Sequence, residues 1–124
     1  MTMPDAIIAS LDDAIAALKQ GGPIRLRSIP FASASLGAAG FLAIIKAARE
    51  AVPGVVSEAI LDCGDAPGHA LGALRLGAEA ISLAAPDDVL AKLAEIAAQT
   101  RAKIYRTSSS GELRAILPAN RPAF

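Results

Sequence analysis

The amino-acid sequence predicts a small α/β domain in which helices cover a mainly parallel sheet. Short apolar segments alternate along the chain with longer segments whose apolar residues recur every three or four positions. The short segments are 24–28, 59–63, 78–83 and 103–107. Strands that alternate with helices in this way form right-handed crossovers and parallel pairs. A chain of 124 residues can bury one core, so residues 1–124 are interpreted as one domain with a four-stranded sheet.

An extra helix over residues 2–20 is expected before the first strand. Thr2 can cap it, with Asp5 three residues later as the partner of a capping box. Apolar residues at spacings of four and three share one face of this helix: Ile7, Leu11, Ile15 and Leu18. Gly21 and Gly22 end it.

The other elements follow from similar start and stop signals. The helices are expected at 36–52, at 66–76 and after Pro86. A loop at 30–35 precedes the first of these. A serine-rich turn at 108–111 follows the fourth strand, and residues 112–117 can add a further short strand.

The distribution of charge among the four strands favours the order 1-2-3-4, an open sheet resembling half of a barrel. The second and third strands are nearly all apolar, as expected of strands covered on both faces. The first carries Arg25 and Arg27 on one side, which an edge strand tolerates; the doubly wound order 2-1-3-4 is the alternative and would make that strand central. In the favoured order all crossover helices lie on one face. The N-terminal helix or a second copy of the chain must then cover the other face, and we predict a homodimer.

Composition excludes several classes of function. Twelve basic and twelve acidic residues give no net charge, and aromatic residues make up only 3%, so neither a basic surface nor a stacking platform for nucleic acid is expected. One cysteine allows no internal disulfide and no zinc cluster, and we expect no metal or cofactor. The longest uncharged run, 28–45, is interrupted by Pro30 and glycines and is too short in its apolar part to span a membrane. With no signal-peptide pattern at the N-terminus, the expected location is the cytoplasm.

The polar residues after the second strand form the richest candidate site, because ligands bind beyond the carboxyl ends of parallel strands. Cys63 lies where this strand meets a helix N-terminus, which can lower a thiol pKa, and His69 could act as its base. Asp65 lies between them. The alternative interpretation is structural: Cys63 is a small buried residue, and Asp65 caps the helix by accepting from the Gly68 N–H. On a helical wheel His69 points away from the sheet.

Further polar and glycine residues at the same edge are candidates for binding a small anionic ligand. They are Ser33, Ser35, Asp62, Gly64, Ser108 and Ser109. The cluster of Ser33 and Ser35 matches no established phosphate-binding motif, and the preferred interpretation of both serine clusters is a capped turn. Gly68 and Gly72 share one helix face, where they either relieve crowding inside the fold or make a contact face for a helix or a small molecule.

Residues 68–83 (GHALGALRLGAEAISL) resemble the βα repeat of phosphate-sugar barrels, in which a helix ending in A-L-x-x-G-A leads into an apolar strand. This resemblance implies packing of a helix on a sheet and nothing specific about catalysis. The chain is about half as long as a complete barrel of roughly 250 residues.

Two hypotheses of function follow from these patterns. The first is a non-catalytic module that binds a ligand or a protein partner in a regulatory or accessory role, because no complete catalytic set is present. The alternative is a small enzyme that hydrolyses or transfers acyl groups, with Cys63 as nucleophile and His69 as base. The reactivity of the Cys63 thiol distinguishes the two.

Overall fold

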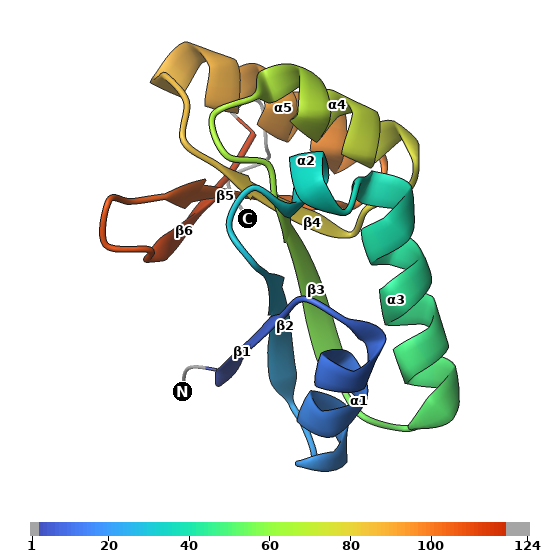
Figure 1. Ribbon diagram of the computed structural model, residues 1–124. Coiled ribbons are helices and arrows are strands. Elements are labelled where there is room, and N and C mark those ends of the chain that lie inside the picture. The colour runs from blue at the N-terminus through green and yellow to red at the C-terminus, as the bar shows by residue number, and fades with distance from the viewer. Residues whose placement is uncertain (1–2, 119–124) are drawn as a thin grey trace.

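The computed structural model describes residues 3–118, which form an α/β fold with a mainly parallel sheet (Figure 1). The strands are β1 (Asp5–Ile8), β2 (Ile24–Ser28), β3 (Ser57–Asp62), β4 (Ala80–Leu83), β5 (Lys103–Thr107) and β6 (Leu113–Ile116). The helices are α1 (Leu11–Lys19), α2 (Ala32–Ser35), α3 (Ala38–Ala51), α4 (Pro67–Arg75) and α5 (Asp87–Gln99). Strands β1 to β5 are parallel in the order of the chain, and β6 is antiparallel to β5. The predicted fold class is therefore confirmed.

The predicted number of four strands is wrong, because the sheet has six. Strand β6 is the short strand that the sequence allowed at 112–117. Strand β1 lies inside the segment predicted as a helix over residues 2–20. The strands predicted at 24–28 and 103–107, which are β2 and β5, have the expected bounds, and the four predicted strands lie side by side in the favoured order.

The N-terminal segment divides into a strand and a helix because a capping box lies later than expected. The Ser10 hydroxyl accepts a hydrogen bond from the Asp13 N–H (3.1 Å), and the Asp13 carboxylate accepts one from the Ala9 N–H (2.9 Å). This reciprocal pair begins α1 at Leu11. Residues 5–8 are then free to pair with β2. Thr2, the cap predicted for the longer helix, lies outside the described residues.

The helices pack on one face of the sheet. Each of α1, α3, α4 and α5 contacts the strand beside it in the chain, and α1 also packs against α3. Figure 1 shows α1 and α3 along β1 to β3, with α4 and α5 across the other half of the sheet. Buried residues of the helices and of alternate strand positions form the main core on this side. The prediction that the first helix could cover the opposite face is therefore wrong.

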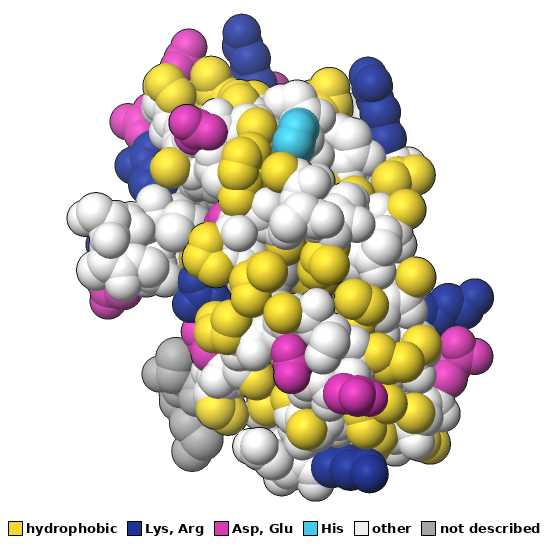
Figure 2. Space-filling model, in the orientation of Figure 1, with side chains coloured by type: hydrophobic (Ala, Val, Ile, Leu, Met, Phe, Trp, Pro, Cys, Tyr) yellow, Lys and Arg dark blue, Asp and Glu magenta, His cyan; other side chains and the backbone are white. Residues whose placement is uncertain are grey.

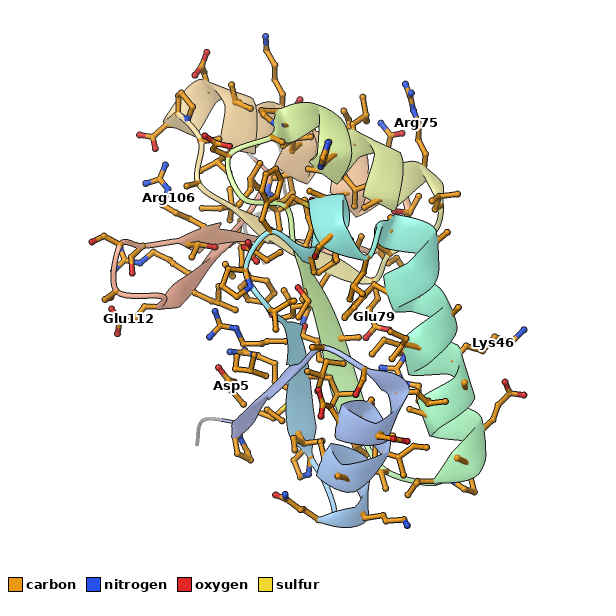
Figure 3. All side chains as sticks on the ribbon, in the orientation of Figure 1. Asp5, Lys46, Arg75, Glu79, Arg106 and Glu112 are labelled. Atoms are coloured by element: carbon orange, nitrogen blue, oxygen red, sulfur yellow. The ribbon has the colours of Figure 1, made fainter. Side chains whose placement is uncertain are left out.

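The opposite face of the sheet carries charged side chains that form ion pairs with one another. Tyr105 donates to both carboxylate oxygens of Glu58 (2.8 and 3.0 Å), and Arg25 and Lys103 lie 3.2 and 3.4 Å from the same carboxylate. Burial, together with the hydrogen bond and charge of Glu58, raises the pKa of Tyr105 to about 12. Asp5, which Figure 3 shows on the side away from α1 and α3, pairs with Arg25 and Arg27.

The β5–β6 hairpin partly covers this second face. The Arg27 guanidinium donates to the Gly111 carbonyl in the hairpin turn (3.0 Å), across the width of the sheet. Leu113 of β6 packs on a small cluster of Ile60, Ala80 and Tyr105. The hairpin and the ion pairs thus cover part of the face for which the sequence predicted the N-terminal helix or a second copy of the chain.

Arg49 and Glu79 attach α3 to the sheet at the opposite end from the candidate site. The guanidinium bonds both Glu79 oxygens (2.7 and 3.1 Å) and also donates to the side chain and carbonyl of Ser57. Burial raises the pKa of Glu79, but hydrogen bonds from Arg49 and the Ala59 N–H outweigh it and lower the pKa overall. Glu79 lies between the sheet and α3 (Figure 3).

Among residues 3–118, no helix has the length and apolar character needed to cross a membrane.

Candidate functional site

The carboxyl ends of β2, β3 and β4 meet around the side chain of Asp62. Its carboxylate accepts hydrogen bonds from the Phe31 N–H (2.6 Å), the Gly64 N–H (3.2 Å) and the Ser82 hydroxyl (2.8 Å). The Asp62 N–H in turn donates to Ser28 (2.9 Å). Asp62 therefore joins three strand ends. The N–H and hydroxyl groups that could bind an external anion here already donate to the Asp62 carboxylate.

Phe31 forms the surface of this edge in a left-handed backbone conformation. Its φ is 52°, a value that the hydrogen bond from its N–H to Asp62 helps to fix. The ring lies over Gly64, where a Cβ atom would come within 2.7 Å of it. The His69 ring also lies close to it, with the ring centroids 5.4 Å apart. Glycine at position 64 is therefore required both by its own φ of 59° and by the Phe31 ring.

Ser33 and His69, predicted for different roles, form a hydrogen-bonded pair. The Ser33 hydroxyl lies 3.0 Å from Nδ1 of His69. The histidine is exposed, as its position on the helical wheel predicts, and Figure 2 shows it (cyan) beside hydrophobic side chains at the surface. The pair joins α2 to α4, and no hydrogen bond between His69 and Cys63 exists among the described side chains.

Cys63 is fully buried, with none of its surface exposed. Its thiol faces the carbonyl of Leu61 at 3.8 Å. Burial raises the pKa of this thiol from 9.0 to about 12, and the charge of Asp62 adds to the increase, while the Ser33 hydroxyl acts in the opposite direction. The thiol is consequently protonated at neutral pH, which is unfavourable for a nucleophile.

Asp65, the third member of the predicted catalytic group, does not cap α4. The N-cap residue is Ala66, which has no side-chain hydrogen bond, and Pro67 occupies the first turn. Asp65 itself is exposed. The expected hydrogen bond to Gly68 is therefore wrong, and proline at the first turn removes one of the N–H groups that a cap would serve.

The other predicted ligand-binding serines lie apart from Asp62. Ser35 is exposed at the end of α2. Ser108 and Ser109 belong to the turn of the β5–β6 hairpin, where the Ser108 hydroxyl bonds Ser110 (2.9 Å) and accepts from the Glu112 N–H (3.1 Å). Ser108 thus stabilises the turn, in agreement with its structural interpretation.

The glycine face of α4 is open. A Cβ atom at Gly68 or Gly72 would meet nothing within 4 Å. These glycines therefore relieve no crowding inside the fold, and that interpretation is wrong; the alternative, an external contact face, stays a prediction.

An apolar groove, which no sequence pattern predicted, lies between α5 and the β5–β6 hairpin. Its volume is about 740 Å³. Its walls combine small residues of α5 with hydrophobic residues of β5, β6 and the segment after β6. The apolar lining residues are Ala94, Ala97, Ala98, Ala102, Ile104, Tyr105, Ala115, Ile116, Leu117 and Pro118. The run of alanines at the end of α5 was the signal available in the sequence.

The charged residues that line this groove are both cationic. They are Arg101, which follows α5, and Lys103, which begins β5. Lys103 lies 3.4 Å from Glu58 on the far face of the sheet, whereas Arg101 makes no ion pair with any residue in the described range. The groove therefore combines an apolar wall with one cation, Arg101, that is unpaired within residues 3–118.

Within the part of the chain that the structure describes, no group of three His, Cys, Asp or Glu residues could hold a metal ion. No protein-family model, curated protein or solved structure matches the chain.

Proposed function

We propose that the chain is a non-catalytic module that binds a small amphipathic anion in the groove between α5 and the β5–β6 hairpin. The observation that carries this proposal is the groove itself. Ligand sites are commonly clefts of roughly 300–1,000 Å³ with mostly apolar walls and a few polar groups. A volume of about 740 Å³ lies within this range and suits a small organic molecule.

The charge of the groove favours an anionic ligand. Arg101 and Lys103 line it, and among residues 3–118 no carboxylate does. An apolar ligand body against the alanine and isoleucine side chains would remove hydrophobic surface from water, while an anionic group would meet the cations at the edge. A second copy of the chain would bring the same two cations against its partner's, which disfavours self-association through this groove.

The candidate site around Asp62 gives less support to catalysis. Cys63 is buried with a raised pKa, and His69 is hydrogen-bonded to Ser33. Polar groups of this edge largely satisfy one another, which favours a structural role. We therefore prefer the binding module to the cysteine enzyme.

Self-association stays a prediction, with the sheet face opposite the helices as its surface. Sedimentation at high protein concentration tests it directly, since a strict monomer would contradict it.

The binding proposal is tested with anilinonaphthalene sulfonate, an apolar dye with one negative charge. Ala98 lines the groove and is exposed, so Ala98→Leu fills the groove without disturbing the core. Ala43→Leu is the matched control, because Ala43 is an exposed residue of α3 outside the groove. We expect Ala98→Leu to weaken the dye affinity at least about fivefold, roughly 1 kcal/mol, and Ala43→Leu to leave it unchanged. Equal affinities for the two variants would refute the proposal.

A further inference from the structure

The end of α5 has an arginine where the chain elsewhere uses glycine. The Ala102 N–H donates to the Ala97 carbonyl (2.9 Å), and the Arg101 N–H donates to the Ala98 carbonyl (3.3 Å). These two hydrogen bonds define a Schellman motif, which requires a left-handed residue just after the helix. Here that residue is Arg101, with a φ of 60°.

Helix α4 ends with the same pair of hydrogen bonds but with glycine at the left-handed position. The Ala78 N–H donates to Ala73 (3.0 Å) and the Gly77 N–H to Leu74 (3.1 Å), with a φ of 96° at Gly77. Gly21 follows α1 with a φ of 88°. A side chain makes this conformation unfavourable, so Arg101 carries a strain that glycine at the same position would remove.

No contact among the described residues compensates for this strain. Arg101 is exposed and has neither an ion pair nor a side-chain hydrogen bond within residues 3–118. Its one distinguishing position is at the groove, which it lines beside Ala98 and Lys103. A residue held in an unfavourable conformation without an internal partner is a candidate for function.

We propose that Arg101 is the anchor that selects the ligand, and that the ligand is an aliphatic carboxylate. This inference rests on the proposed function of the groove. The guanidinium would bind the carboxylate through its paired N–H donors, and the alkyl chain would lie against Ala98 and Ile116. Most of the lining is aliphatic, which suits an alkyl chain. Lys103 is less suited to the role, because its ammonium lies 3.4 Å from Glu58.

The test compares octanoate with octanol, which has the same alkyl length and no charge, by amide NMR titration of the whole chain. In the wild type, both should shift the amides of Ala98 and Ile116, and octanoate should bind more tightly. Arg101→Gln keeps most of the side-chain stem and removes the charge. We expect it to weaken octanoate about tenfold and to leave octanol unchanged.

Arg101→Gly distinguishes an anchor from a structural residue. It should weaken octanoate to the same extent while raising the melting temperature by about 3 °C, because the strain is removed. If Arg101 had only a structural role, Arg101→Gly would change the melting temperature without weakening octanoate binding. Lys103→Gln is the matched control and should reduce octanoate binding less than twofold.

The groove and the Arg101 anchor can be refuted separately. If neither octanoate nor octanol shifts groove amides of the wild type, the proposed function is wrong and the anchor with it. If both bind and Ala98→Leu prevents this, but Arg101→Gln binds octanoate like the wild type, the groove stands and the anchor is refuted. Loss of octanoate preference in Lys103→Gln alone would likewise overturn the assignment to Arg101.

Discussion

The edge of the sheet around Asp62 and the groove beside α5 differ in how far their groups are already satisfied. At the edge, Asp62 accepts three hydrogen bonds and Ser33 bonds His69. In the groove, apolar walls face open space and Arg101 has no ion-pair partner in the described part of the chain.

In this chain, a concentration of polar residues therefore does not by itself indicate a binding site. Polar groups that bond one another stabilise the fold and leave few donors or acceptors for a ligand. Apolar walls next to an unpaired charge favour ligand binding, because a ligand can bury apolar surface and form an ion pair there.

The largest expected effect concerns the chemical reactivity of Cys63. A pKa of about 12 in place of 9.0 lowers the thiolate fraction at pH 8 by roughly a thousandfold, in addition to the exclusion of reagent by burial. Iodoacetamide should therefore alkylate the native protein at least roughly a thousandfold more slowly than the urea-unfolded chain. Alkylation of native Cys63 at the rate of a free thiol near neutral pH would restore the enzyme hypothesis.

The same raised pKa predicts a loss of stability at alkaline pH. Since the folded state holds the Cys63 proton more tightly than the unfolded state, stability decreases as pH rises above 9.0 toward about 12. Cys63→Ala should reduce this dependence, which urea unfolding between those pH values measures.

The second prediction tests whether Asp62 is structural. Asp62→Ala leaves the Phe31 N–H, the Gly64 N–H and the Ser82 hydroxyl without their acceptor, so we expect a loss of about 3 kcal/mol in the free energy of unfolding. Asp88→Ala is the control, since Asp88 is an exposed carboxylate in the first turn of α5, and should cost at most about 0.5 kcal/mol.

Both variants are measured by urea unfolding, with dye binding as a second readout. The folded Asp62→Ala protein should bind anilinonaphthalene sulfonate like the wild type, because the groove lies elsewhere. A loss of dye affinity with little loss of stability would move the binding site to the edge of the sheet.

The third prediction exchanges the residues that follow α4 and α5. Gly77→Arg should lower the free energy of unfolding by about 1 kcal/mol, because a Cβ there meets nothing within 4 Å and only the left-handed backbone opposes it. Arg101→Gly should raise it by up to about 1 kcal/mol for the same reason. Thermal or urea unfolding measures both, and a less stable Arg101→Gly protein would contradict the argument from strain.

Sequence patterns predicted the interior strands of the sheet and allowed β6 at one edge, but they failed at the other edge, β1. β2 alternates apolar with basic residues, so its bounds could be derived from period alone, and the predicted bounds of β5 also agree with the structure. β1 has only four residues, and Ile7 and Leu11 also satisfy the spacing of a helix that continues through Ser10. Its conformation is decided by pairing with β2, a contact between distant parts of the chain that local periodicity does not contain.

The sequence could predict the polar edge but not the groove, because the two depend on different features of the fold. The strand order alone brings Asp62 and the loop after β2 together. Whether the Asp62 carboxylate is free or occupied depends on the backbone of Phe31 and Gly64, both with positive φ. The groove requires the position of β6 against α5, which is fixed only once β6 pairs with β5.

The smallest expected effect concerns Ser33 and His69, the side-chain pair most similar to a catalytic one. Because both residues lie toward the surface, Ser33→Ala and His69→Ala should each cost about 0.5 kcal/mol of stability, and the double variant should show a coupling below about 1 kcal/mol. Hydrolysis of nitrophenyl acetate should be equally slow in the wild type and in Ser33→Ala. A faster wild-type reaction that Ser33→Ala removes would show that the hydrogen bond with His69 activates the serine. The polar edge would then have a chemical function at this pair, and the description of its groups as already satisfied would be wrong.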